Sequence, residues 1–264
     1  MLQLVTINIG AAGQARAERI ADWLDDRDDD VIILTETSNG PGTAWLLDRF
    51  RTAGWRVIHT PSPDGDRSAA IVTRIAGRAP HIRLDLKVPL PHRLPTCWLD
   101  TTPAIPVVGA YVPSRDRSAT KVDKKKGFIE DLVAAVATTP EFVRGGMILG
   151  GDLNVIDRFH QPAHTGFLDF ELDMAKRLTE NGLLDAFTHC QPGVQEHSWV
   201  GRTGDGYRYD YLYVGAPLTR VLASCNYIHN TRPGLTDHSA VHMRLNIRVL
   251  ERLPITEPAA STLF

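Results

Sequence analysis

The sequence predicts a mixed α/β fold, in which two packed sheets carry helices on their outer faces. Short apolar runs rich in valine and isoleucine alternate with helix-like segments along the 264 residues. Runs of strands broken by a few helices are typical of such layered folds, although periodicity alone does not separate them from other mixed folds. The hydrophobic content of 43% is enough to bury one large core. Because neither a sequence repeat nor an interior linker divides the chain, we expect one domain.

The first half of the chain is expected to be rich in strands. It begins with a strand at residues 2–9 and a helix at 16–28, whose apolar stripe contains Ala17, Ile20 and Leu24. The later elements expected here are a strand at 31–35, a helix at 40–53, and strands at 56–60, 68–73, 82–86, 96–100 and 107–112.

The second half repeats this texture. Its expected helices span 121–137 and 169–181, the latter closed by Gly182, and a strand lies between them at 147–149. Further strands are expected at 197–200, 208–214, 221–229 and 240–247. Residues 253–264 contain Pro, Ser and Thr without periodicity, so we expect a flexible tail after a catalytic domain at 1–252.

Charge and cysteine content limit the class of protein only loosely. Lys+Arg number 29 against 31 Asp+Glu, for a formal net charge of -2. A net charge this close to zero does not indicate a nucleic-acid binder. A local basic surface around an acidic site would not be visible in the net charge, however. The three cysteines are far apart, which argues against a disulfide framework. With no signal-like start and no membrane-spanning apolar stretch in the sequence, we expect a cytoplasmic monomer that does not bind membranes.

Polar residues that could carry chemistry stand at or just after the expected strand ends. They are Asn8, Glu36, Asp152, Asn154, Asp210, Asp237 and His238. Nearly all are hard oxygen ligands, which suit Mg²⁺ or Mn²⁺ better than a structural zinc. Carboxylates, a metal and one histidine are the mixture that attack of water on phosphorus requires.

Each residue also has a plainer interpretation. Glu36 could be a solvated residue at a strand end, and the Gly-Asp-Leu-Asn segment at 151–154 could be an ordinary turn. Asp210 could pair with Arg208 on the sheet surface, and the pair at 237–238 could cap a helix. No fragment decides the matter alone, so their order in the chain carries the argument.

That order resembles the endonuclease/exonuclease/phosphatase superfamily over residues 6–242. The matching segments are a strand ending in Asn8, a strand ending in Glu36, Tyr-x-Pro at 111–113, Gly-Asp-x-Asn at 151–154, Arg-x-Asp-Tyr at 208–211 and Asp-His at 237–238. The resemblance implies a four-layer α/β/β/α sandwich, with two mixed central sheets between helices and the active site at one edge of the sheets.

The resemblance also implies roles at the metal and the attacking water. Glu36 would be the principal metal ligand, with Asn8 and Asp237 near the metal. Asp152 would orient the attacking water and help to deprotonate it, and Asn154 would hold that water or the phosphate.

Other implied roles concern the phosphate. His238 would contact the scissile phosphate, Asp210 would fix the histidine ring from about 3 Å, and Tyr111 would donate a hydrogen bond to the phosphate or the leaving group.

Three positions depart from the family pattern. Thr35 stands where a Gln is common, Gly109 stands where an Asn is common, and residues 37–39 lack the Lys found in the exonuclease III-like branch. The hydrolytic residues are intact, and the departures bear on the DNA-repair assignment.

The remaining candidates are residues that could bind substrate. Trp199 could stack on a base or sugar, or pack in the core. Arg115, Lys121, Lys124 and Lys125 form a basic cluster after Tyr111 that could neutralise backbone phosphates, or form a solvated helix start.

Three functions follow from these observations. The first is a nuclease acting on DNA, of the exonuclease III or apurinic endonuclease type, at abasic sites or 3′ ends. The second is a phosphatase or phosphodiesterase acting on a phosphoinositide, a sphingolipid or another small phosphoester. The third is a degenerate, non-catalytic binding module, against which the intact acidic residues argue.

Overall fold

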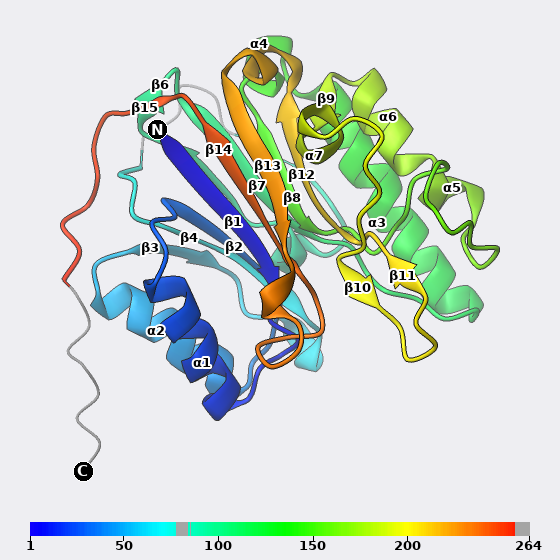
Figure 1. Cartoon of the computed structure of the whole chain (residues 1–264), viewed down its shortest axis with the longest axis horizontal. Coiled ribbons are helices and arrows are strands. Elements are labelled where there is room, and N and C mark those ends of the chain that lie inside the picture. Colours follow the sequence, from blue (N-terminus) through cyan, green and yellow to red (C-terminus); the bar gives the residue numbers. More distant parts are fainter. Residues whose placement is uncertain (78–83, 85, 257–264) are drawn as a thin grey trace.

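Two mixed sheets form the centre of the molecule. The computed structural model describes residues 1–77, 84 and 86–256, and in this part of the chain no helix is long and apolar enough to cross a membrane. The six-stranded sheet has the order β13-β14-β1-β2-β4-β3, and the five-stranded sheet has the order β5-β7-β8-β12-β9. The two sheets pack face to face between helices (Figure 1). The predicted four-layer sandwich is confirmed.

Strands of the six-stranded sheet come from both ends of the chain. They are β1 (Leu2–Asn8), β2 (Val31–Thr37), β3 (Arg56–His59), β4 (Ser68–Thr73), β13 (Leu222–Ile228) and β14 (Ala240–Leu245). β1 is central and pairs parallel to β2 and antiparallel to β14. Helices α1 (Gln14–Asp25) and α2 (Pro41–Thr52) cover its outer face.

The five-stranded sheet comes from the middle of the chain. Its strands are β5 (Thr96–Leu99), β7 (Ile105–Tyr111), β8 (Ile148–Asp152), β9 (Leu183–Asp185) and β12 (Asp210–Gly215). Its outer face is covered by α3 (Ala119–Thr138) and α6 (Met174–Glu180). The smaller elements are α4 (Glu141–Arg144), α5 (Asp169–Leu172), α7 (Ala186–Cys190), and the two-residue strand pairs β6 (Thr101–Thr102) with β15 (Arg248–Val249) and β10 (Trp199–Val200) with β11 (Gly206–Tyr207).

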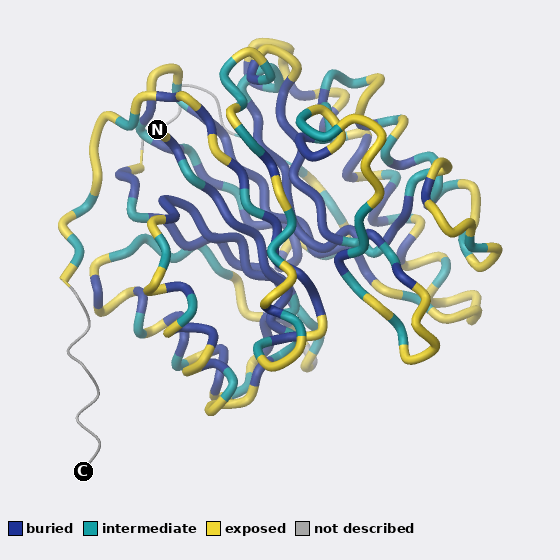
Figure 2. The backbone as a smooth tube through the Cα atoms, in the orientation of Figure 1, coloured by how far each residue is buried: buried dark blue, intermediate teal, exposed yellow. Residues whose placement is uncertain are grey.

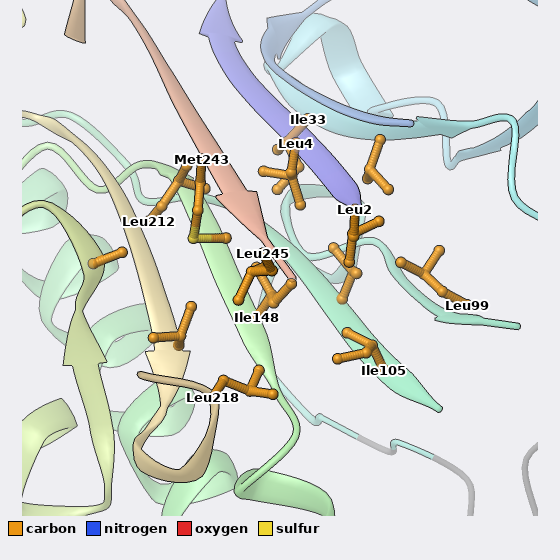
Figure 3. Close-up of a cluster of buried hydrophobic side chains, with 14 of the residues drawn as sticks. Leu2, Leu4, Ile33, Leu99, Ile105, Ile148, Leu212, Leu218, Met243 and Leu245 are labelled. Carbon is orange, nitrogen blue, oxygen red and sulfur yellow. The ribbon is translucent and has the colours of Figure 1, made fainter. Parts of the chain in front are cut away.

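The main core lies between the two sheets. Leu2, Leu4 and Ile33 of one sheet meet Ile148 and Leu212 of the other, and all are buried (Figure 3). Successive side chains of a strand point to opposite faces, so the intervening residues pack against the helices instead. The central strands are buried along most of their length, whereas exposure concentrates on helix faces and loops (Figure 2).

Several predicted elements have different limits. The helix expected at 169–181 is interrupted at Asp173 and forms α5 and α6. The strand expected at 147–149 continues to Asp152, because residues 148–152 pair with both neighbouring strands. Residues 82, 83 and 85 of the strand expected at 82–86 lie outside the described residues, and β9 and α7 were not predicted.

Residues just after the predicted domain boundary lie against the domain. The Leu253 amide donates to the Arg74 carbonyl oxygen at 2.8 Å, and the Thr256 amide donates to the Ala53 carbonyl oxygen at 3.1 Å. Residues 257–264 lie outside the described part of the chain. The boundary at residue 252 stays a prediction.

Candidate active site

The strand alternation brings three candidate residues to one end of the layer between the sheets. Asn8 follows Leu2 and Leu4 at even spacing along β1, and Asp152 follows Ile148 in the same way along β8. Asp210 precedes Leu212 by two residues in β12 and is the direct cross-strand partner of Asp152. Alternate residues of a strand share one face, so these polar side chains lie on the same face as the apolar core residues, at the edge of the central core.

Asp210 and His238 form a buried pair. Asp210 Oδ2 lies 2.7 Å from His238 Nδ1, which confirms the predicted distance. The Ser198 hydroxyl accepts a hydrogen bond from the Asp210 amide at 3.0 Å, and the Tyr227 hydroxyl donates to the Asp210 carbonyl oxygen at 2.6 Å. Because the backbone and one carboxylate oxygen are fixed, the orientation of the imidazole is fixed as well.

The plainer interpretation of Asp210 as a partner of Arg208 is wrong. The Arg208 guanidinium is buried and pairs with Asp185 at 2.7 Å. It also donates to the Tyr227 hydroxyl at 2.7 Å.

Asn8 joins the acidic residues of the site. Its Nδ2 donates to Asp152 Oδ2 at 2.8 Å and to Glu36 Oε1 at 3.1 Å, and it lies 3.4 Å from His238 Nε2. Its Oδ1 accepts a hydrogen bond from the Gly10 amide at 2.8 Å. Asn8 therefore presents its N–H groups to the carboxylates and holds them, while its oxygen is turned away from them.

Two site residues adopt the left-handed backbone conformation. Glu36 has φ 52° at an irregularity where β2 pairs with β4, and Asn154 has φ 50° in the turn after β8. For residues other than glycine such a conformation costs about 1–3 kcal/mol, and such costs cluster at functional sites. The Asn154 turn is held by its amide, which donates to Asp152 Oδ1 at 2.9 Å, and by its Nδ2, which donates to the Val112 carbonyl oxygen at 3.0 Å.

Burial and crowding shift the pKa values at this site. Burial, reinforced by the charges of Asp210 and Glu36, raises the pKa of Asp152 to about 8. Burial alone would lower the pKa of His238, but the charge and hydrogen bond of Asp210, with the charges of Asp152 and Asp237, raise it to about 10. The site thus favours an imidazolium and disfavours a further negative charge.

The donor set fits a hard divalent cation. Carboxylate oxygens of Asp152 and Asp210 lie within 4.8 Å of each other and of a His238 ring nitrogen, although His238 as an imidazolium has no lone pair to offer a metal. Asp210 Oδ1 is buried without a hydrogen-bond partner among the described residues. Glu36, which is partly exposed, adds a further carboxylate at the rim. Carboxylate oxygens in this number are the ligands that Mg²⁺ and Mn²⁺ prefer.

The site opens into a pocket of about 390 Å³. Its lining combines site residues with charged and aromatic side chains: Glu36, Ser114, Arg115, Lys125, Asn154, Gly166, Phe167, Glu171, Trp199, Tyr207, Tyr209, Asp237 and His238. Trp199 Nε1 donates to Asp237 Oδ2 at 3.0 Å. The Trp199 ring lies 5.5 Å from that of Tyr207 and 5.9 Å from that of Tyr209. Trp199 thus belongs to an aromatic wall of the pocket.

The predicted basic cluster is divided. Lys125 is buried and donates to Glu171 Oε1 at 2.6 Å and to the Asn154 carbonyl oxygen at 2.5 Å. Arg115 also pairs with Glu171. Lys121 and Lys124 are exposed and pair with Asp116 at 2.9 Å and with Asp66 at 3.2 Å. The four cations do not form the single phosphate-binding cluster that the sequence predicted.

Several residues of the site were not predicted. Glu171 lies in the segment that the sequence indicated only as a helix, and nothing in its spacing marked it. Tyr207 and Tyr209 precede Asp210 in the same tyrosine-rich segment, and this closeness in sequence could have identified them as neighbours of the site. Ser198 directly precedes Trp199, and its hydroxyl accepts from the Tyr209 amide at 2.9 Å.

Sequence comparison identifies the family to which this fold and its acidic edge belong. Residues 5–238 match the sequence profile of the Endonuclease/Exonuclease/phosphatase family, and the chain belongs to this family, which is metal-dependent. An exodeoxyribonuclease of Bacillus subtilis (strain 168) is 28% identical over 155 residues, which cover 53% of this chain and 60% of the relative. The alignment therefore spans less than two thirds of that relative's length.

Solved structures share the fold at low sequence identity. An AP endonuclease from Archaeoglobus fulgidus has a TM-score of 0.75 at 20% identity, covering 93% of this chain and 100% of that one. A 3′-5′ exonuclease from Neisseria meningitidis has a TM-score of 0.76 at 19% identity, covering 92% and 99%. A 3′ phosphatase from Neisseria bound to a product DNA hairpin has a TM-score of 0.73 at 20% identity, covering 93% and 100%.

Proposed function

We propose that this chain is a DNA phosphodiesterase that depends on Mg²⁺ or Mn²⁺, acting as an exonuclease or endonuclease of the exonuclease III and apurinic endonuclease type. The observation that carries the proposal is the buried Asp210–His238 pair, at 2.7 Å, on the rim of a pocket with an aromatic wall. A fixed imidazolium beside carboxylates can contact a phosphate while a neighbouring group activates water.

Each residue has a role that its contacts allow. His238, held in one orientation by Asp210, donates to an oxygen of the scissile phosphate. Asp152 accepts the proton of the attacking water once it is ionised, and its raised pKa makes the ionised carboxylate a stronger base than an ordinary one. Asn154 uses its Nδ2 for the Val112 carbonyl oxygen, so its Oδ1 is left to accept a hydrogen bond from that water.

Glu36 is the principal metal ligand in this proposal, with Asp237 on the same pocket lining. A bound Mg²⁺ would neutralise charge on the phosphate oxygens. Tyr111 lies beside Glu36 and donates to the phosphate or the leaving group. Burial and the charges of Glu36 and Asp152 raise the pKa of Tyr111, so its hydroxyl keeps its proton and serves as a donor.

The aromatic wall supports a nucleic-acid substrate. Trp199, Tyr207 and Tyr209 offer ring faces and edges beside the phosphate-binding residues. Stacking of a base on an aromatic side chain contributes about 1–3 kcal/mol without regard to sequence. The DNA-bound structural neighbour from Neisseria supports the same substrate class.

A panel of substrates tests the proposal. Purified protein is incubated with nicked, abasic and intact duplex DNA in Mg²⁺, in Mn²⁺ and in EDTA, and products are resolved on denaturing gels. We expect metal-dependent cleavage of at least one DNA substrate, and loss of cleavage in Asp152→Asn. Cleavage that persists in Asp152→Asn would indicate a contaminating nuclease, and no cleavage of any DNA would refute the proposal.

A second candidate is hydrolysis of a small phosphoester. It is favoured by the ion pairs that Lys121 and Lys124 form with Asp116 and Asp66, because paired lysines are less available to a DNA backbone. Inositol phosphates and phosphoinositides in the same panel separate the two candidates. Hydrolysis of these esters without cleavage of DNA would support the second candidate.

A further inference from the structure

A buried arginine lies against Tyr111, outside the residues assigned above. Arg93 ends a short 3₁₀ turn at Pro91–Arg93, and its side chain is 5% exposed. Its guanidinium carbon lies 4.4 Å from the centre of the Tyr111 ring. Tyr111 is itself buried, at the end of β7, where it pairs with Asp152 of β8. The Arg93 guanidinium therefore contacts a residue of the proposed site directly.

Asp66 holds the guanidinium in this position. Arg93 donates to Asp66 through Nη2 at 2.5 Å and through Nε at 3.2 Å, and His92 Nε2 lies 3.2 Å from the same carboxylate. Partial burial would raise the pKa of Asp66, but the hydrogen bonds and charge of Arg93 keep it well below its usual range. Asp66 is thus a carboxylate at neutral pH, and it anchors Arg93 in a two-point ion pair.

One guanidinium donor is left over. Arg93 Nη1 is buried and has no hydrogen-bond partner among the described residues. A buried donor without a partner costs free energy, and Arg49, Arg115 and Arg232 each have one as well in the described part of the chain; what distinguishes Arg93 is that its guanidinium also lies over the ring of a proposed site residue. The unpaired donor and the stacking on Tyr111 together indicate a use for the cation at this ring.

We propose that Arg93 is a positioning residue, which orients Tyr111 and polarises its hydroxyl toward the phosphate. This inference rests on the proposed function. A cation over the face of a ring attracts its π electrons and fixes its plane, and a nearby positive charge makes the phenol a stronger hydrogen-bond donor. Residues 37–39, which follow Glu36, supply no cation on their own loop. Arg93 supplies one from a different segment.

The test is a double-mutant cycle between Arg93 and Tyr111. Arg93→Met, Tyr111→Phe and the double variant are assayed on the best DNA substrate of the panel and on bis(4-nitrophenyl) phosphate. We expect Arg93→Met to lower kcat by about tenfold, the size of a partly buried cation–π contact, with little change in KM. In the Tyr111→Phe background the same substitution should have almost no effect on kcat, because no hydroxyl remains to be oriented.

A matched control is available elsewhere in the fold. Arg27 stacks on Trp23 at 4.6 Å and pairs with Asp29 at 2.5 Å, so Arg27→Met removes a similar contact far from the site and should leave kcat unchanged. If Arg93→Met does not fold, as judged by circular dichroism, Asp66→Asn loosens the same guanidinium without removing it. Asp66→Asn should then lower kcat only where the Tyr111 hydroxyl is present.

The outcomes separate this inference from the proposed function. An active wild-type enzyme whose Arg93→Met and Tyr111→Phe losses multiply would overturn the inference alone, since a merely structural arginine gives independent effects. An active Arg93→Met variant with wild-type kcat would do the same. A wild-type protein that hydrolyses no phosphoric diester would overturn the proposed function and this inference with it.

Discussion

Replacing Asp210 with asparagine should leave the fold intact and strongly lower turnover. Asp210→Asn keeps the shape of the side chain, and the backbone contacts to Ser198 and Tyr227 do not depend on its charge. What the substitution removes is the negative charge 2.7 Å from His238 Nδ1. The imidazole then loses the partner that keeps its pKa raised.

The magnitude follows from the kind of hydrogen bond that is lost. A hydrogen bond to a charged group contributes about 1.5–3 kcal/mol, roughly twice a neutral one, and the pair is buried, so little solvent screening reduces it. If most of this free energy is used to hold a charged His238 against the phosphate in the transition state, turnover falls on the order of 10²-fold. A larger loss would follow if the amide also favours the wrong tautomer of the ring.

The assay is a kinetic double-mutant cycle with His238. Asp210→Asn, His238→Ala and the double variant are compared by kcat on the same substrate. Residues that act as one unit are not additive, so the double variant should be little worse than His238→Ala. The matched control is Asp29→Asn, because the buried Asp29 lies 3.2 Å from His242 Nε2 in a second Asp–His pair away from the site. This control should retain turnover.

Two results would refute the reasoning. Losses that simply multiply in the double variant would show that Asp210 does not act through His238. A fall in turnover for Asp29→Asn as large as for Asp210→Asn would show that the effect is a general consequence of opening a buried pair.

Three further predictions concern the metal, the substrate and stability. Chelation should abolish activity and Mg²⁺ or Mn²⁺ should restore it, with Glu36→Gln raising the metal concentration at half-maximal activity; full activity after exhaustive chelation would contradict this. Replacing Lys121 and Lys124 with glutamine should weaken DNA binding alike for all sequences and reduce the log–log salt slope by about one unit per lost phosphate contact, whereas unchanged binding would favour a small phosphoester. Burial lowers the pKa of His160 from its ordinary 6.5, so its contribution to stability is present above that pH and lost as pH falls through it. Denaturant unfolding at acidic and neutral pH should therefore show a smaller difference for His160→Gln than for wild type, and equal differences would exclude this role.

The sequence was informative where local rules decide the structure. Short apolar runs rich in valine and isoleucine predicted most strands of the two sheets, and the polar residues at the ends of these runs, such as Asn8 and Asp152, were predicted to form the site. The Asp210–His238 contact was predictable only from the order of motifs, because the two residues belong to segments that meet through the β10 region, where Trp199 bridges to His238. No local pattern carries that information.

Partners that come together from distant segments were not predictable. Lys125 stands in a run of lysines that indicates a solvated helix face, yet its side chain is buried because Glu171 offers a carboxylate at 2.6 Å. Lys124 beside it is exposed and reaches Asp66 at 3.2 Å. Which lysine of the run points inward depends on the rotation of α3 over the sheet, and the charges in the run do not fix that rotation.

The proposed site is kept at a cost to stability, and this cost can be measured. Asp152 and Asp210 are direct cross-strand partners, and like charges placed opposite each other destabilise a sheet. Because burial and the neighbouring carboxylates raise the pKa of Asp152 to about 8 from its ordinary 3.8, the folded metal-free protein holds this proton more tightly than the unfolded chain does. Its stability should therefore fall as pH rises from about 4 to about 8. Asp152→Asn removes the titrating group, so the metal-free variant should lose most of this fall in stability between about pH 4 and about pH 8, and it should also lose turnover. A variant that keeps the wild-type pH dependence of stability in EDTA would show that Asp152 is not the group that titrates over this range.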